Sequence, residues 1–322
     1  MEGKNMLDRN EQQIVIMIFA TQKPFSLSSI DDNFYPAYLT YEYEIEDPFY
    51  LHQLLIEHGY YEPSTPEQIL ESFNLAMLKE LIGNRGKKSG KKPELIERAM
   101  NLYTSEELAA MLPSDYYSLS DKGRMLLDQC QDFILLHQNK LWEITYDEYC
   151  LARNQMAPQY SFRDVIWRIL NERIAKTDPI KNYGCLRNIY YTMSDVTKKL
   201  DHSDKKAASL LLTTFLFDIC TVIDDIYSYQ SAGAPLTDIS CDTLFFAPAI
   251  IKSLTDSKDL LPEIPYRSVI KPPYFERIYT EKDYNDLVAD LSGNSPFDSE
   301  KWYKLCEKRS SDFVSKFSAK GK

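Results

Sequence analysis

The amino-acid sequence predicts a mainly helical protein, because apolar residues repeat at helical spacing and recognisable helix starts precede them. Between 161 and 176 the apolar residues fall on one face of a helix. The run Thr65-Pro66-Glu67-Gln68 combines a capping threonine, a proline in the first turn and a glutamine that can close a capping box. Two further segments, 182–200 and 204–229, predict a helical hairpin joined at Asp201-His202-Ser203.

In the first part of the chain, the patterns predict short helices separated by turns. Pro48–His58 forms one helix, and Thr104 can cap another that ends at Met111. Tyr117–Gly123 predicts a short extended piece that leads into a capped helix ending near His137. Residues 38–45 alternate aromatic and acidic side chains, which fits either a strand or a short helix.

A change of pattern near 140–160 predicts a domain boundary. Gln155, Ala157, Pro158 and Gln159 interrupt the helical spacing there. We therefore expect an N-terminal domain at 1–142 and a C-terminal helical domain, organised as a bundle, at 143–322. Further helices of the C-terminal domain are expected near 241–255, 280–291 and 299–317.

The composition is that of a folded, acidic protein: 44% of its 322 residues are hydrophobic, and the net charge is −11. This content argues against global disorder, and the acidic balance argues against a general nucleic-acid coat protein. Polar residues interrupt the apolar segment Ala207–Ile223, so we expect a buried helix, no membrane partner and a cytoplasmic protein. The six cysteines form no C-x-x-C pair, and we expect them to be reduced and buried without zinc.

One positive segment stands out against this charge. Residues 1–70 carry a net charge of −9, residues 71–105 carry +3, and residues 106–322 carry −5. The positive charge centres on a loop between two amphipathic helices. A second helix that starts at Ser89-Gly90 would place free backbone N–H groups beside lysines, an arrangement that suits a phosphate group. The nucleic-acid-binding candidates are Lys79, Arg85, Lys87, Lys88, Ser89, Gly90, Lys91, Lys92 and Arg98.

The stretch 74–99 resembles a SAP domain, a small helix–loop–helix module best known for binding DNA. The run SGKKPELIER is its most specific part. The resemblance implies a module at 73–102 that contacts DNA phosphates with weak sequence selectivity and strong salt dependence. The family's apolar loop residues are replaced here by Gly86-Lys87-Lys88. A second interpretation is that the helices pack into a larger domain and the lysines form a solvated face. The other residues that carry the resemblance are Leu75, Leu78, Lys79, Leu81, Leu95, Ile96 and Arg98.

The wider region 34–137 resembles SAP-containing proteins of phages and prophages of Gram-positive bacteria. The runs 35–39, 54–60 and 117–123 carry this resemblance, and 186–193 fits it. It implies a mobile-element origin, the cytoplasm of a bacterial host as location, and no established catalytic activity. Residues 104–137 also resemble the end of a winged helix; a turn and a cap inside any helical domain is the alternative.

The sequence favours a protein that is not an enzyme. Val222–Tyr227 resembles the aspartate-rich metal motif of class I terpene synthases, but Ser228 stands where a third acid is expected. Asp218, Asp224 and Asp225 are therefore expected to be helix-end or surface acids. We expect neither a bound metal nor a cofactor, because no second metal motif and no G-x-x-x-x-G-K loop is present.

Two functional hypotheses follow from the sequence, and an unrecognised enzyme is a third. The first is a non-enzymatic, DNA-associated protein of phage or prophage type that contacts phosphates through the basic helix–loop–helix. The alternative is a phage-encoded protein-interaction factor, such as an anti-defence inhibitor of a host defence protein or an inhibitor of a host replication protein. In that case the acidic surface would dock on a bacterial host or phage protein. The sequence leaves the oligomeric state open.

Overall fold

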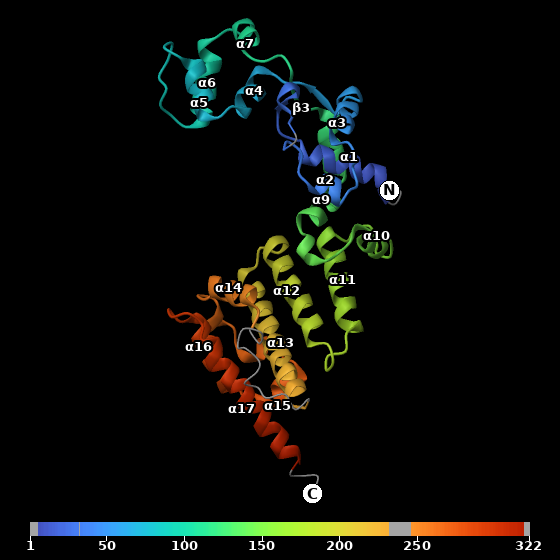
Figure 1. The fold of residues 1–322 in the computed structure, drawn as a ribbon, viewed down its shortest axis with the longest axis vertical. Helices are drawn as coiled ribbons and strands as arrows, with labels where there is room; N and C mark the ends of the chain where they lie inside the picture. Colours follow the sequence, from blue (N-terminus) through green and yellow to red (C-terminus); the bar gives the residue numbers. More distant parts are fainter. Residues whose placement is uncertain (1–5, 32, 232–245, 319–322) are drawn as a thin grey trace. The chain divides into compact units, whose positions relative to one another are not determined.

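The computed structural model describes residues 6–31, 33–231 and 246–318 (Figure 1). Helices make up most of this part of the chain and its strands are short, which confirms the predicted mainly helical class. The chain divides into two compact units, Met1–Asp147 and Glu148–Lys322. The sequence pattern predicts this division after residue 142.

The N-terminal unit combines short helices with a three-stranded antiparallel sheet. β3 is the central strand: its Tyr117 pairs with Phe25 of β1, and its Leu119 pairs with Tyr61 of β2. The sheet therefore joins three segments that are far apart in the sequence. The elements are α1 (Arg9–Ala20), β1 (Phe25–Ser26), η1 (Leu27–Ser29), α2 (Tyr38–Tyr41), α3 (Pro48–Glu57), β2 (Tyr61–Pro63), α4 (Pro66–Ser72), α5 (Leu75–Ile82), α6 (Lys92–Leu102), α7 (Ser105–Met111), β3 (Tyr116–Leu119), α8 (Asp121–Gln129), α9 (Gln131–Gln138) and η2 (Lys140–Trp142).

The first core of this unit forms where α1 packs against α3 and α8. Residues 15–18 of α1 are almost completely buried, as expected for a helix covered on several sides. The buried imidazole of His52 adjoins this core, with its ring centroid 4.4 Å from that of Phe25 and 4.9 Å from that of Tyr61. His52 Nδ1 lies 3.0 Å from the Tyr35 hydroxyl, whereas its Nε2 has no hydrogen-bond partner among the residues that the structure describes.

Helices α4 to α7 build a second core, separate from the first. The two helices expected within 73–102 supply its centre, and the flanking helices α4 and α7 complete it. The basic loop is thus attached to a packed four-helix cluster, which positions it. The buried residues of this core are Ile69, Leu70, Phe73, Leu78, Ile82, Leu95, Ala99, Tyr103, Leu108 and Leu112.

Three local features of this unit differ from, or decide between, the sequence-based expectations. Residues 38–41 form a short helix, α2, so the alternation at 38–45 does not produce a strand. The helix expected to run to His137 is interrupted at Cys130, where the chain turns so that α9 can bury Phe133 and Ile134. The winged-helix-like piece expected at 104–137 is divided, because α7 packs in the second core and α8 and α9 face the first.

The C-terminal unit is built around one long helix, α13, which packs against α12, α14, α15 and α17. Its segment Asp204–Ile223 is long and apolar enough to cross a membrane, but 78% of it is buried within the protein, as expected for a core helix. The unit contains α10 (Tyr146–Asn154, which begins just before the division), α11 (Phe162–Lys176), α12 (Tyr183–Leu200), α13 (Asp204–Ser231), α14 (Pro248–Asp256), η5 (Leu261–Glu263), η6 (Tyr266–Ser268), α15 (Pro273–Ile278), α16 (Glu281–Ser292) and α17 (Ser299–Ser318). Residues 241–245 of the helix expected at 241–255 lie outside the described residues.

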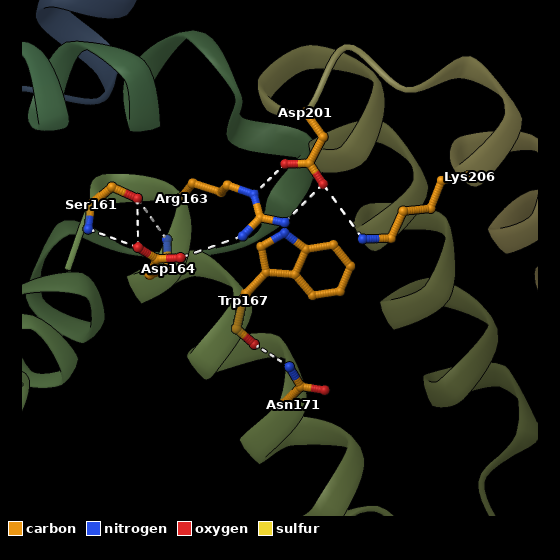
Figure 2. A network of polar contacts seen from close by, with 7 residues as sticks. All are labelled: Ser161, Arg163, Asp164, Trp167, Asn171, Asp201 and Lys206. Atoms are coloured by element: carbon orange, nitrogen blue, oxygen red, sulfur yellow. Dashed lines mark hydrogen bonds and ion pairs between the residues drawn. The ribbon is translucent and has the colours of Figure 1, made fainter.

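The turn between α12 and α13 is anchored to α11 by a polar network (Figure 2). Asp201 follows α12, and its carboxylate accepts a hydrogen bond from Arg163 Nη2 at 2.9 Å and lies 3.6 Å from Lys206 Nζ. Both cations also lie over the Trp167 ring, at 5.5 Å and 5.0 Å from its centroid. The network ties α11 to the hairpin, whose turn contains His202 at a φ of 50°.

The expectation that Asp218 is a helix-end or surface acid is wrong. Its residue is 2% exposed and lies in the middle of α13. The carboxylate is tolerated there because it accepts hydrogen bonds from Arg187 and from the Ala247 backbone N–H, each at 2.8 Å. The side chains of Asp224 and Asp225 lie outside the described residues.

Candidate nucleic-acid interface

Two short helices flank the basic loop. α5 begins after Asn74, whose side-chain oxygen accepts hydrogen bonds from the N–H groups of Ala76 and Met77 at 2.9 and 3.0 Å. It ends at Gly83, whose φ of 53° lies in the left-handed region that favours glycine. The Tyr103 hydroxyl donates a 2.7 Å hydrogen bond to the carbonyl oxygen of Leu81, near that end. The geometry is a helix–loop–helix over residues 75–102.

The second helix starts later than the sequence analysis expects. α6 begins at Lys92, and Lys91 occupies the N-cap position, so Ser89 and Gly90 lie outside the helix. The Glu94 carboxylate accepts a hydrogen bond from the Lys91 N–H at 3.3 Å, as a glutamate at the third helical position can. The Lys-x-x-Glu spacing is thus the signal for the helix start. The carboxylate occupies part of the helix end that was expected to hold a phosphate, which leaves the lysines as the candidate anion ligands.

Two of the predicted cations have partners elsewhere in the helical cluster. The Arg85 guanidinium lies 4.8 Å from the centroid of the Tyr103 ring, and its Nη1 is 3.4 Å from a carboxylate oxygen of Glu107. Lys92 Nζ donates a hydrogen bond to the carbonyl oxygen of Glu71 at 2.5 Å. Both contacts join the loop region to the flanking helices, so these side chains are partly committed to holding the cluster together.

Arg98 is also engaged within the protein, with the loop itself. Its Nη1 donates hydrogen bonds to the carbonyl oxygens of Lys87 and Ser89, the second at 3.0 Å. Arg98 is half-buried, whereas Lys87 and Ser89 are exposed. Arg98, unlike the exposed lysines of the predicted site, therefore contacts the backbone of the loop.

Four lysines of the predicted site remain available to bind an anion. The ammonium groups of Lys79, Lys87, Lys88 and Lys91 have no ion-pair or hydrogen-bond partner among the described residues, and all four side chains are exposed. Lys87, Lys88 and Lys91 lie together on the loop, whereas Lys79 lies on α5. Exposed ammonium groups without partners can neutralise phosphate groups, and each contact would release a counterion.

The structure supplies no alternative metal centre within the residues that it describes. No group of three or more His, Cys, Asp or Glu side chains there could hold a metal ion. Cys130, Cys150, Cys220 and Cys306 are buried, whereas Cys185 is exposed, contrary to expectation. Cys241 lies outside the described residues.

The N-terminal unit contains a cleft that the sequence does not predict. Its volume is about 860 Å³, and it lies between residues 30–40 and the start of α3. Three exposed carboxylates, those of Asp31, Glu46 and Asp47, line it together with the 40% exposed ring of Phe49. The net charge of −9 over residues 1–70 was the available signal, but it does not reveal which acids meet in space.

Comparisons of the chain with known protein families, with curated proteins and with solved structures gave no match. The resemblance to SAP domains therefore depends on the sequence motif at 74–99. The chemistry available at this site is the binding of anions by lysine side chains.

Proposed function

We propose that this chain is a non-enzymatic, DNA-associated protein of phage or prophage type that contacts DNA phosphates through the loop between α5 and α6. The observation that carries the proposal is the set of three exposed ammonium groups at Lys87, Lys88 and Lys91, which pair with none of the described residues and lie on one loop of a packed helical cluster. The resemblance to SAP domains, which is carried in part by the same lysines, also supports it. Charge contacts to phosphates position a protein on DNA without reading its bases.

The charge distribution limits how strong this binding can be. The rest of the chain is acidic, so it repels DNA, and a few lysines contribute few phosphate contacts. Each contact lowers the logarithm of the affinity by roughly 0.9 per logarithmic unit of salt. The proposal therefore predicts weak, salt-sensitive binding with little preference between DNA sequences.

A titration of a short DNA duplex at several salt concentrations tests the proposal. The triple variant Lys87→Ala, Lys88→Ala, Lys91→Ala should lose most of the affinity, and its salt slope should fall by about 2–3. The matched control replaces three exposed lysines of the C-terminal unit, Lys181, Lys198 and Lys252, by alanine. The control has the same net charge as the loop variant but should bind like the wild type. No binding by the wild type at the lowest salt concentration would refute the proposal.

The acidic cleft favours a second candidate function, that of a protein-interaction factor. Carboxylates beside an exposed aromatic ring suit a lysine or arginine side chain of a basic partner, through ion pairing and a cation–π contact. In this proposal a bacterial host or phage protein with a basic surface docks at Asp31, Glu46 and Asp47. A partner recovered from host lysate should then be lost with Asp31→Lys, Glu46→Lys and retained with the triple loop variant. The opposite pattern would exclude the cleft as the docking site.

A further inference from the structure

One side chain of α6, that of Arg98, donates hydrogen bonds to the backbone of the basic loop. Arg98 Nη1 donates hydrogen bonds to two carbonyl oxygens of the loop, those of Lys87 and Ser89. One guanidinium group therefore fixes two backbone positions that lie two residues apart. Because both carbonyl groups accept hydrogen bonds from Arg98, the backbone on either side of Lys88 is restricted. The side chain of Lys88 itself is exposed.

The packing of Gly86 adds to this attachment. A Cβ atom at this position would lie 2.8 Å from Leu102 Cδ1, 3.2 Å from Ile82 Cγ2 and 3.4 Å from Arg98 Cδ. The loop backbone therefore lies directly on the helices and on the aliphatic part of Arg98. This close approach takes the place of the apolar loop residues that SAP domains carry at Gly86-Lys87-Lys88, and it explains how the loop can be ordered without them.

The far end of the loop is held by the same helix. Glu94, one turn before Arg98 on α6, accepts the hydrogen bond from the Lys91 N–H. The carboxylate and the guanidinium thus fix both sides of the segment 87–91. A binding loop that is ordered before the ligand arrives loses less conformational entropy on binding, which raises affinity.

We propose that Arg98 is a positioning residue of the phosphate-binding loop and not itself a phosphate ligand. It holds the backbone of Lys87–Ser89 so that the ammonium groups of Lys87, Lys88 and Lys91 face solvent together. This inference extends the proposed DNA binding, on which it rests. It differs from the sequence-based expectation, in which Arg98 is one more cation in contact with DNA.

Two substitutions of Arg98 separate these interpretations. Arg98→Lys keeps the charge but loses the planar fork that reaches two carbonyls, whereas Arg98→Met keeps only the aliphatic stem. If Arg98 positions the loop, both variants should bind the DNA duplex about tenfold more weakly than the wild type, with nearly unchanged salt slopes. If Arg98 contacts a phosphate, Arg98→Lys should bind like the wild type and Arg98→Met should lose about 0.9 from the slope, which would overturn the proposal.

Amide hydrogen exchange in the free, full-length protein tests the attachment without DNA. Both Arg98 variants should accelerate exchange at residues 87–91 and leave α5 and α6 protected, which also shows that the module remains folded. Lys88→Ala is the matched control and should leave loop exchange unchanged. Unchanged loop exchange in the Arg98 variants overturns the proposal. Wild-type protein that fails to bind DNA, despite accelerated exchange in the variants, overturns the proposed function and with it the positioning role.

Discussion

Arg187 Nη1 donates a hydrogen bond to Asp218 Oδ1 at 2.8 Å, which joins α12 to α13 inside the C-terminal unit. The side chain of Asp218 is 2% exposed and that of Arg187 is 27% exposed, so the pair lies largely away from water. The other carboxylate oxygen accepts the Ala247 N–H, just before α14 begins. One buried carboxylate thus connects three segments of the unit.

Asp218→Ala should lower the free energy of unfolding by about 3–5 kcal/mol, because it leaves a partly buried guanidinium and a backbone N–H without their acceptor. Chemical denaturation monitored by circular dichroism measures this loss. The double variant Asp218→Leu, Arg187→Met should be more stable than Asp218→Ala, since it removes both charges together. A loss below about 1 kcal/mol in Asp218→Ala would contradict this account.

The burial of His52 predicts that acid weakens the N-terminal unit. Burial lowers the pKa of His52 from 6.5 to about 4, because the charged imidazolium would lose its hydration. The unfolded chain therefore binds a proton at a higher pH than the folded chain does. The contribution of the neutral His52 to stability is fully present above pH 6.5. It is lost as the pH falls toward 4, which lowers the free energy of unfolding by about 3 kcal/mol in total.

Denaturation of wild type and His52→Phe between pH 7 and pH 4 measures this effect. The variant should have a flatter dependence of stability on pH over this window. Tyr35→Phe is the control: it removes the hydrogen bond to Nδ1 but leaves the imidazole buried, so its pH dependence should match that of the wild type. Identical pH dependence in His52→Phe and wild type would show that burial of this ring does not control acid sensitivity.

The lowered pKa of the Asp201 carboxyl predicts a second loss of stability, at a lower pH than that caused by His52. The hydrogen bond from Arg163, followed by the charges of Arg163 and Lys206, holds the pKa of the Asp201 carboxyl below its usual range. Its contribution is therefore present above the unfolded value and is lost as the pH falls through the folded value. Asp201→Asn should cost about 1.5–3 kcal/mol near neutral pH and less at strongly acidic pH. A cost that does not depend on pH would contradict this explanation.

Local signals made many helix starts predictable. Thr65 and Thr104 each cap a helix by accepting a hydrogen bond from the N–H three residues later, as their sequence context indicates. The start of α6 was misplaced because Ser89-Gly90 resembles a cap more than Lys91 does. The hydrogen bond that the Glu94 carboxylate accepts from the Lys91 N–H decides this position. Capping chemistry is local, so such errors are confined to a few residues.

The candidate site was only partly predictable, because charge can be read from the sequence but its partners cannot. The segment 85–92 was identified by its lysines, yet nothing local shows that Arg98 donates to the loop carbonyls or that Lys92 binds Glu71. The same limit applies to Asp218, whose partners lie 31 and 29 residues away. Long-range polar contacts depend on the packed arrangement of helices, which helical periodicity alone does not specify.

Replacing glycine by alanine is expected to change the stability of the protein in opposite directions at two helical positions, Gly123 and Gly184. A Cβ at Gly123, in α8, would lie 2.4 Å from Leu119 Cδ1 and 2.6 Å from the carbonyl oxygen of Tyr60, so this glycine lets α8 approach the sheet. Gly184 lies in the first turn of α12, and no atom of the described part of the chain lies within 4 Å of such a Cβ. Gly123→Ala should therefore destabilise the protein by about 1–3 kcal/mol through overpacking.

Gly184→Ala should instead stabilise it by about 0.4–1 kcal/mol, because alanine restricts the unfolded chain and fits the helical backbone without a clash. Denaturation curves of the two variants, measured side by side with the wild type, give both changes. Since the substitution is chemically identical, a difference in sign isolates the effect of the packed environment. Equal effects at the two positions would mean that α8 can move away from the Tyr60 backbone without loss of stability.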